Sequence, residues 1–138
     1  MAALTGDRTD FSQRATWRTF TGDVKGGVIL YFGALLAVDA NGWIVPASDT
    51  AGLKVVGVAF ESVDNSNGVN GAKTVQIATG VFRFANAGGA VTQSNRHRDV
   101  YVADDNSVTT AGVAANDIKA GTVDEFTASV VWVRVAPE

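Results

Sequence analysis

From residue 26 onward, short apolar runs alternate with clusters of glycine, asparagine and aspartate. The clearest unit has an extended, mostly apolar run at 35–39, a turn sequence ending in Asn41-Gly42, and a second run at 43–46. Asn-Gly readily adopts the positive φ angles of a tight hairpin loop, and Pro46 suits the end of a strand or a sheet edge. The unit predicts a β-hairpin, and similar units along the chain favour an all-β fold.

Later strand candidates show the side-chain alternation of β-strands. Val75 and Ile77 face one way until Gly80 interrupts the run, and Phe82 and Phe84 then share a face. Further strands are expected over residues 53–63, 99–103, 121–127 and 129–135, the last two as a closing pair. A chain of 138 residues can bury one core. We therefore expect a small β-barrel or sandwich of short antiparallel strands.

Residues 1–25 differ from residues 26–138 in composition and pattern. They mix arginine, aspartate and threonine with a few aromatic residues, and the only strand candidate is short, at 15–20. Such a segment cannot form its own core, so we expect an extended N-terminal arm before a β-barrel-like domain. Its aromatic and arginine side chains suit docking on the main body or on another chain. The candidate contact residues are Phe11, Arg14, Trp17, Arg18 and Phe20.

Few residues of the chain could support common catalytic chemistry. There is no cysteine, and the one histidine, His97, lies between Arg96 and Arg98. No Gly-x-Ser-x-Gly turn presents a nucleophile, and no glycine-rich phosphate loop follows a strand. The polar turn at 64–68 lacks the glycine and glutamate spacing of a calcium loop. We therefore expect no enzymatic activity, no cofactor and no metal site.

Charge and hydropathy disfavour two kinds of partner. The net charge is −3, whereas sequence-independent nucleic-acid binding needs a basic excess. The longest apolar window, 28–38, is interrupted by Gly33 and is too short to span a membrane. The first residues lack the basic-then-apolar order of a signal peptide. We expect a protein made in the cytoplasm that binds neither nucleic acid nor membrane.

An ordered series of segments resembles capsid cement proteins, also called head decoration proteins, of tailed bacteriophages. The longest segment is GALLAVDANGWIVPASDTAGLKVVGVA, residues 33–59. Further similar segments, in the same order, are 71–75, 80–86, 91–93, 100–106, 120–123 and 131–135. The resemblance covers about residues 25–135, so the first 24 residues, the segment 111–117 and the cluster 96–98 lie outside it.

The resemblance implies a structural protein of the virion. Proteins of this family have a β-rich, barrel-like domain that binds the outer capsid surface, often as trimers, and bridges neighbouring major capsid subunits. No catalytic residue comes with the family. The arm lies outside the resemblance, so its role is inferred from its own residue types: Phe11, Arg14, Trp17, Arg18 and Phe20 are candidates for capsid or partner contact. Phe82 and Phe84 are candidates for a contact between subunits. The alternative, which carries at least equal weight, is that both are ordinary core residues.

Two other interpretations remain open at this stage. The chain could be a binding module on a virion or cell surface that recognises a glycan or a receptor, with Trp17, Trp43 or Trp132 as the stacking platform. A small enzyme that uses His97 as its base is the least favoured, because no nucleophile is placed beside it.

Overall fold

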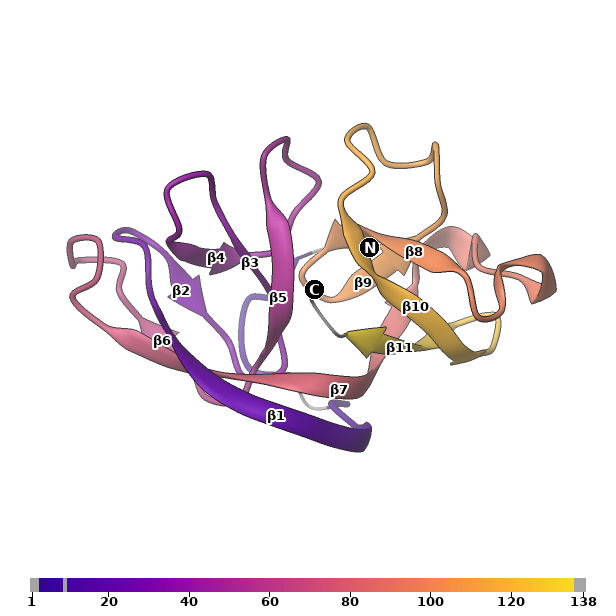
Figure 1. The fold of residues 1–138 in the computed structure, drawn as a ribbon, viewed down its shortest axis with the longest axis horizontal. Helices are drawn as coiled ribbons and strands as arrows, with labels where there is room; N and C mark the ends of the chain where they lie inside the picture. The colour runs from indigo at the N-terminus through magenta and orange to yellow at the C-terminus, as the bar shows by residue number, and fades with distance from the viewer. Residues whose placement is uncertain (1–2, 9, 136–138) are drawn as a thin grey trace.

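A computed structural model describes residues 3–8 and 10–135 (Figure 1). In this part of the chain, regular structure consists of strands of 2 to 13 residues and two single-turn 3-10 segments, Ala87–Gly89 and Gln93–Asn95. The all-β class predicted from the sequence is therefore confirmed. Two strands, at 13–23 and 74–86, are longer than the short strands expected, and the pairing of 74–86 with 107–109 is parallel where antiparallel strands were expected. The strands are β1 (Gln13–Asp23), β2 (Ile29–Leu30), β3 (Leu35–Val38), β4 (Ile44–Pro46), β5 (Lys54–Ala59), β6 (Val63–Asp64), β7 (Thr74–Asn86), β8 (Asp99–Asp104), β9 (Ser107–Thr109), β10 (Lys119–Phe126) and β11 (Val130–Val135).

The sheet is organised around β7, which pairs with β1, β5, β9 and β11. Ala78 pairs with both β1 and β5, Phe82 with β1 and β11, and Ala85 with β11 and β9. It follows that β5 and β11 share one edge of β7, while β1 and β9 share the other. β11, β10, β8 and β9 close with β7 into a small five-stranded barrel, as expected. β5, β3 and β4 extend the sheet beyond it (Figure 1).

Two hydrophobic cores, where the chain length predicted one, are built on β7, one along each half of the strand. Val75 and Ile77 are buried in a cluster with β2, β3 and β4. Phe82 and Phe84 are buried inside the barrel among valines of β8, β10 and β11. The odd-numbered face is thus buried in the first half and the even-numbered face in the second. Both phenylalanines are 0% exposed. Neither side chain therefore has surface available for the predicted subunit contact, and both occupy the core, which was the alternative given for them.

Gly80 lies where the sequence predicted a break, yet β7 continues through it. It pairs with Thr16 of β1 and with Val135 of β11. A Cβ at this position would overlap the carbonyl oxygen of Ala15, so only glycine lets β1 approach this closely. Gly80 therefore allows β1 to pair closely with β7 and does not end the strand.

The predicted hairpin at residues 35–46 forms from β3 and β4. The Asp39 carboxylate accepts hydrogen bonds from the backbone N–H groups of Trp43 at 3.0 Å and Asn41 at 2.9 Å. The Trp43 hydrogen bond is the main reason that the pKa of Asp39 is below its usual value. Gly42 adopts a positive φ of 89°, as an Asn-Gly turn requires. β10 and β11 likewise pair as the expected closing strands.

The segment that precedes β1 is fastened to the body by two side chains. Arg8 is buried, which lowers its pKa, and its guanidinium donates to the carbonyl oxygen of Gly33 at 3.2 Å. The same group lies 5.0 Å from the centre of the Phe84 ring. The Phe11 ring stacks on Phe82 with 5.7 Å between ring centres. The N-terminal segment therefore docks on the main body, and its later residues enter the sheet as β1.

Candidate functional site

Two β-bulges in β1 place an arginine and a tryptophan on the surface of the sheet. The pairing of β1 with β7 shifts register at Arg14 and again at Trp17, so neither residue faces a paired residue on β7. Trp17 is 47% exposed, which makes it one of the few large exposed apolar side chains among the described residues. The bulges direct both side chains to one outer surface, near the residues of β11.

The bulged side chains reach past β7 to β11. The guanidinium carbon of Arg134 lies 5.2 Å from the centre of the Trp17 ring, and that of Arg14 lies 4.3 Å from the centre of the Trp132 ring. Arg14 also forms an ion pair at 3.3 Å with Asp124 of β10. Each cation–π contact at an exposed site contributes about 0.5–1 kcal/mol and fixes the orientation of both groups. We call Trp17, Trp132, Arg14 and Arg134 the tryptophan–arginine face.

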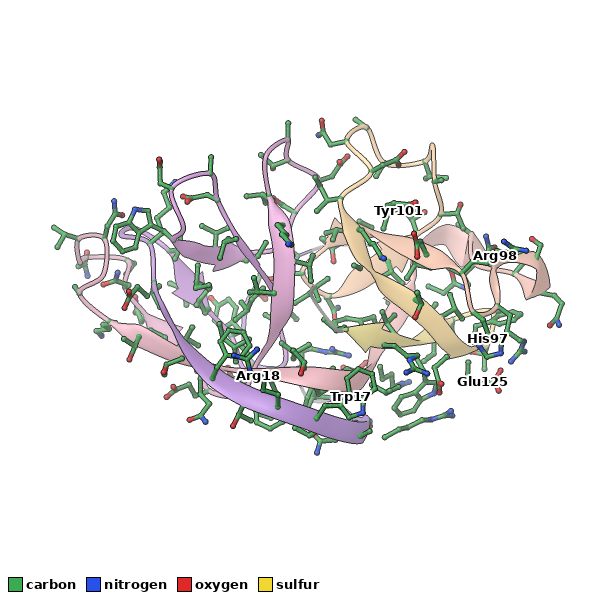
Figure 2. The ribbon with its side chains drawn as sticks, viewed as in Figure 1. Trp17, Arg18, His97, Arg98, Tyr101 and Glu125 are labelled. Atoms are coloured by element: carbon green, nitrogen blue, oxygen red, sulfur yellow. The ribbon has the colours of Figure 1, made fainter. Side chains whose placement is uncertain are left out.

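Further arginines flank this face (Figure 2). Arg18 lies beside it on β1, with its guanidinium carbon 4.8 Å from the centre of the Phe20 ring. At the other end, Arg96 is paired with Glu125, and this hydrogen bond holds the pKa of Glu125 below its usual value. Figure 2 shows Arg98 near the same end, above His97. We call the five residues Arg14, Arg18, Arg96, Arg98 and Arg134 the arginine band.

The charge of the arginine band is opposite to that of the whole chain. Its five cations are accompanied by two carboxylates, Asp124 and Glu125, which leaves an excess of three positive charges. The complete chain has a net charge of −3. A surface of this kind attracts acidic groups and, through Trp17, also offers apolar area.

The structure brings together Arg14, Trp17 and Arg18 of the predicted contact residues, and all three are exposed. Phe11 and Phe20 are half-buried and pack against the two cores, so they support the fold more than they offer contact area. Trp132 and Arg134 are two positions apart on β11 and share one face of that strand. The contact of Arg134 with the N-terminal residues was not predicted, because nothing in the sequence signals that β1 and β11 flank β7.

The three tryptophans considered as a glycan platform do not form one surface. Trp17 and Trp132 both belong to the tryptophan–arginine face. Trp43 lies in the β3–β4 hairpin and packs against Gly71 of the loop before β7. β4 and β11 are at opposite ends of the sheet order. A stacking platform could therefore use two of the three rings.

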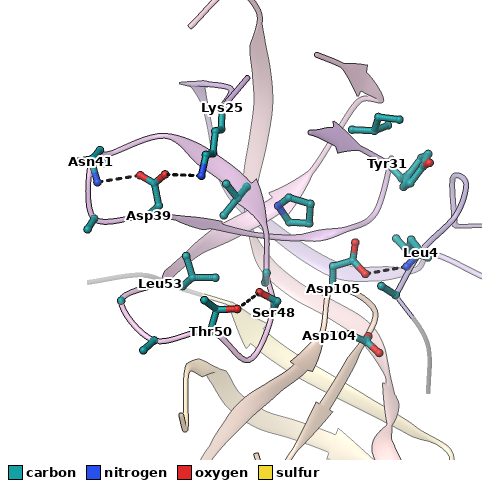
Figure 3. A pocket seen from close by; sticks show the side chains of 18 residues that line it. Leu4, Lys25, Tyr31, Asp39, Asn41, Ser48, Thr50, Leu53, Asp104 and Asp105 are labelled. Carbon is teal, nitrogen blue, oxygen red and sulfur yellow. Dashed lines mark hydrogen bonds and ion pairs between the residues drawn. The ribbon is translucent and has the colours of Figure 1, made fainter. Parts of the chain in front are cut away.

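A groove of about 680 Å³ lies between the β3–β4 hairpin and the turn that joins β8 to β9 (Figure 3). In its lining, Asp105 is buried and accepts a hydrogen bond from the Leu4 N–H at 3.0 Å. Burial raises the pKa of this carboxyl. The hydroxyls of Ser48 and Thr50 are hydrogen-bonded to each other at 2.8 Å, and no histidine lines the groove to activate them. The groove therefore does not place a histidine base beside the hydroxyl of Ser48 or Thr50.

His97 lies in the turn before β8, at the end of the arginine band (Figure 2). Its side chain is exposed, and its backbone N–H donates to the carbonyl oxygen of Val123 at 3.0 Å. Within residues 3–8 and 10–135, no group of three or more histidine or acidic side chains is arranged to hold a metal ion. In the same part of the chain, no helix has the length and apolar character needed to cross a membrane.

Comparisons with protein-family models, with curated proteins and with solved structures found no match to this chain. The tryptophan–arginine face is therefore judged by its own chemistry. Tryptophan and arginine are the residue types most enriched at the energetic centres of protein interfaces. The face suits contact with another macromolecule better than it suits a reaction.

Proposed function

We propose that this chain is a structural virion protein that binds the outer surface of a tailed-phage capsid and stabilises it as a cement or decoration protein. The ordered resemblance of residues 25–135 to such proteins supports the proposal, and the all-β barrel agrees with the fold that the resemblance implies. The partner is the major capsid protein, and neighbouring capsid subunits are bridged. The protein is made in the host cytoplasm and acts on the virion surface, without a cofactor or a catalytic step.

The observation that carries the proposal is the exposed Trp17 stacked against Arg134. Trp17 is 47% exposed and lies against an arginine, and tryptophan and arginine are both enriched among the residues that contribute most to binding at protein interfaces. The cation–π contact holds the ring in one orientation, so little conformational entropy is lost when it docks. The face is therefore preorganised for a protein contact.

Reinforcement of a capsid follows from bridging. A contact of standard size buries about 1,600 Å², and that contact must be broken before two bridged subunits separate. Repetition over a symmetric shell multiplies a modest gain at each site. We propose a homotrimer, which would present three copies of the tryptophan–arginine face. Sedimentation analysis of the purified chain would measure its mass and test this part.

Co-sedimentation of the full chain with undecorated phage heads tests the main proposal. We expect saturable binding and heads that resist heating better when they are decorated. The proposal would be contradicted if the chain bound to none of the undecorated heads tested from tailed phages that encode a chain of this kind. Deletion of residues 1–25 is a poor variant for this test, because it removes β1 from β7 and exposes the barrel core.

A second candidate function is recognition of a glycan by a virion-surface module. The observation that favours it is the common location of Trp17 and Trp132, since flat exposed rings stack on sugars. Binding of the isolated chain to a glycan array, together with no affinity for heads, would favour this function. Binding to heads with no array signal would favour the cement protein.

A further inference from the structure

Three members of the arginine band have no acidic partner within the described part of the chain. Arg18, Arg98 and Arg134 form no ion pair and no side-chain hydrogen bond there, whereas the other two are each paired with a carboxylate. Arg18 and Arg134 are nevertheless held in place by stacking on aromatic rings. A stacked guanidinium keeps the N–H donors on its edge available. The band thus presents oriented and unused donors for anions.

We propose that the partner surface that meets the tryptophan–arginine face is acidic, with aspartate or glutamate side chains placed against Arg18, Arg98 and Arg134. This inference rests on the proposed function and names the chemistry of the contact. A carboxylate accepts two parallel hydrogen bonds from one guanidinium, and an ion pair of this kind is stronger than a neutral hydrogen bond. Trp17 lies beside Arg134 and excludes water from the pair when it is covered.

The carboxylates within the band favour an acidic protein over a nucleic acid. Asp124 and Glu125 lie among the arginines, paired with Arg14 and Arg96. Duplex DNA carries one negative charge about every 1.7 Å, so a DNA backbone laid along the band would pass both carboxylates. An acidic protein surface can place its charges only where unpaired arginines lie.

The exposed ring of Trp17 provides the readout for a direct test. The full chain would be titrated with a short poly-glutamate peptide and, separately, with duplex DNA of equal charge, while tryptophan fluorescence is recorded. A Trp17→Phe variant identifies the part of the signal that comes from this ring. We expect a response to the peptide that weakens as salt is added, because salt screens exposed charges. A stronger response to DNA than to the peptide would overturn the inference.

Neutralisation of arginines tests the same point. In an Arg18→Gln/Arg134→Gln double variant, we expect the affinity for the peptide to fall by roughly tenfold for each arginine. Lys73→Gln removes an exposed cation outside the band, next to the start of β7, and should leave the affinity unchanged. Circular dichroism would show that each variant is folded. Equal affinity of the double variant and the unaltered chain for the peptide would overturn the inference.

Binding of the same variants to undecorated heads separates this inference from the proposed function. If the unaltered chain does not bind heads, the proposed function fails. If the unaltered chain and the double variant bind heads equally well at low salt, the acidic contact fails while the proposed function stands. We expect the unaltered chain to bind and the double variant to bind at least about tenfold more weakly.

Discussion

The guanidinium carbon of Arg134 on β11 lies 5.2 Å from the centre of the Trp17 ring on β1, although β7 runs between the two strands. Trp17 lies at a register shift of β1 and so faces no paired residue on β7, and Gly80 lets β1 approach β7 closely beside it. It joins a segment near the N-terminus to the final strand. The exposed ring therefore belongs to a surface made by three strands.

Replacement of Trp17 by alanine should reduce binding much more than stability. The ring is 47% exposed, so we expect the free energy of unfolding to fall by about 1 kcal/mol at most, mainly through loss of the contact with Arg134. Binding to undecorated heads should weaken at least about tenfold, as for a central tryptophan of an interface. Thermal denaturation and co-sedimentation measure the two effects.

Val113→Ala is the matched control for this variant. Val113 is 65% exposed, in the loop between β9 and β10, and Figure 1 shows this loop at the opposite side of the molecule from β1. We expect neither stability nor head binding to change. The role given to Trp17 would be contradicted if Trp17→Ala bound heads as tightly as Val113→Ala.

Phe82 should behave as a core residue. The side chain is fully buried in the barrel and stacks on Phe11, so Phe82→Ala leaves a large cavity and should lower the free energy of unfolding by about 3–5 kcal/mol. Urea denaturation would measure this loss. The milder Phe82→Leu variant should remain folded and keep the sedimentation coefficient of the unaltered chain. A change of oligomeric state in that folded variant would argue for a subunit contact.

The parts of the fold that were predictable depend on residues close in sequence. The β3–β4 hairpin follows from the turn at Asn41-Gly42, and the β10–β11 pair follows from alternating valines. The pairing of β1 with β7 was not predictable, because it joins residues about sixty positions apart. Its one local requirement is a glycine at position 80, and in the sequence a glycine there is equally typical of a strand break. The exposed position of Trp17 depends on a bulge in that same pairing. Its inclusion among the contact residues came from residue type alone.

Asp49 should control the order of the loop between β9 and β10. Its carboxylate accepts hydrogen bonds from the N–H groups of Ala115 at 2.7 Å and Asn116 at 2.8 Å, and these bonds lower its pKa. In Asp49→Ala, we expect faster hydrogen exchange at both amides and little change in global stability, since these groups are exposed. NMR-detected exchange measures the effect site by site. Unchanged protection of both amides would show that the loop is ordered without Asp49.

Asp105 should make stability depend on pH in the opposite sense from most carboxyl groups. Burial raises its pKa above the ordinary value of 3.8, which it regains on unfolding. Between these two pKa values the folded chain binds more protons than the unfolded chain. The contribution of Asp105 to the free energy of unfolding therefore decreases as pH rises through this interval, and it remains unfavourable at neutral pH.

Asp105→Asn removes the buried charge and keeps an oxygen that can accept the hydrogen bond from the Leu4 N–H. We expect this variant to be more stable than the unaltered chain at neutral pH and nearly equal to it in acid, where the carboxyl is protonated. The control is Asp64→Asn. Hydrogen bonds from Ser66 lower the pKa of Asp64, so this carboxylate stabilises the fold at neutral pH and its replacement should be destabilising there. Urea denaturation at both pH values measures the difference. A loss of stability in Asp105→Asn at neutral pH would mean that attraction to the buried Arg8 outweighs the cost of burying the charge.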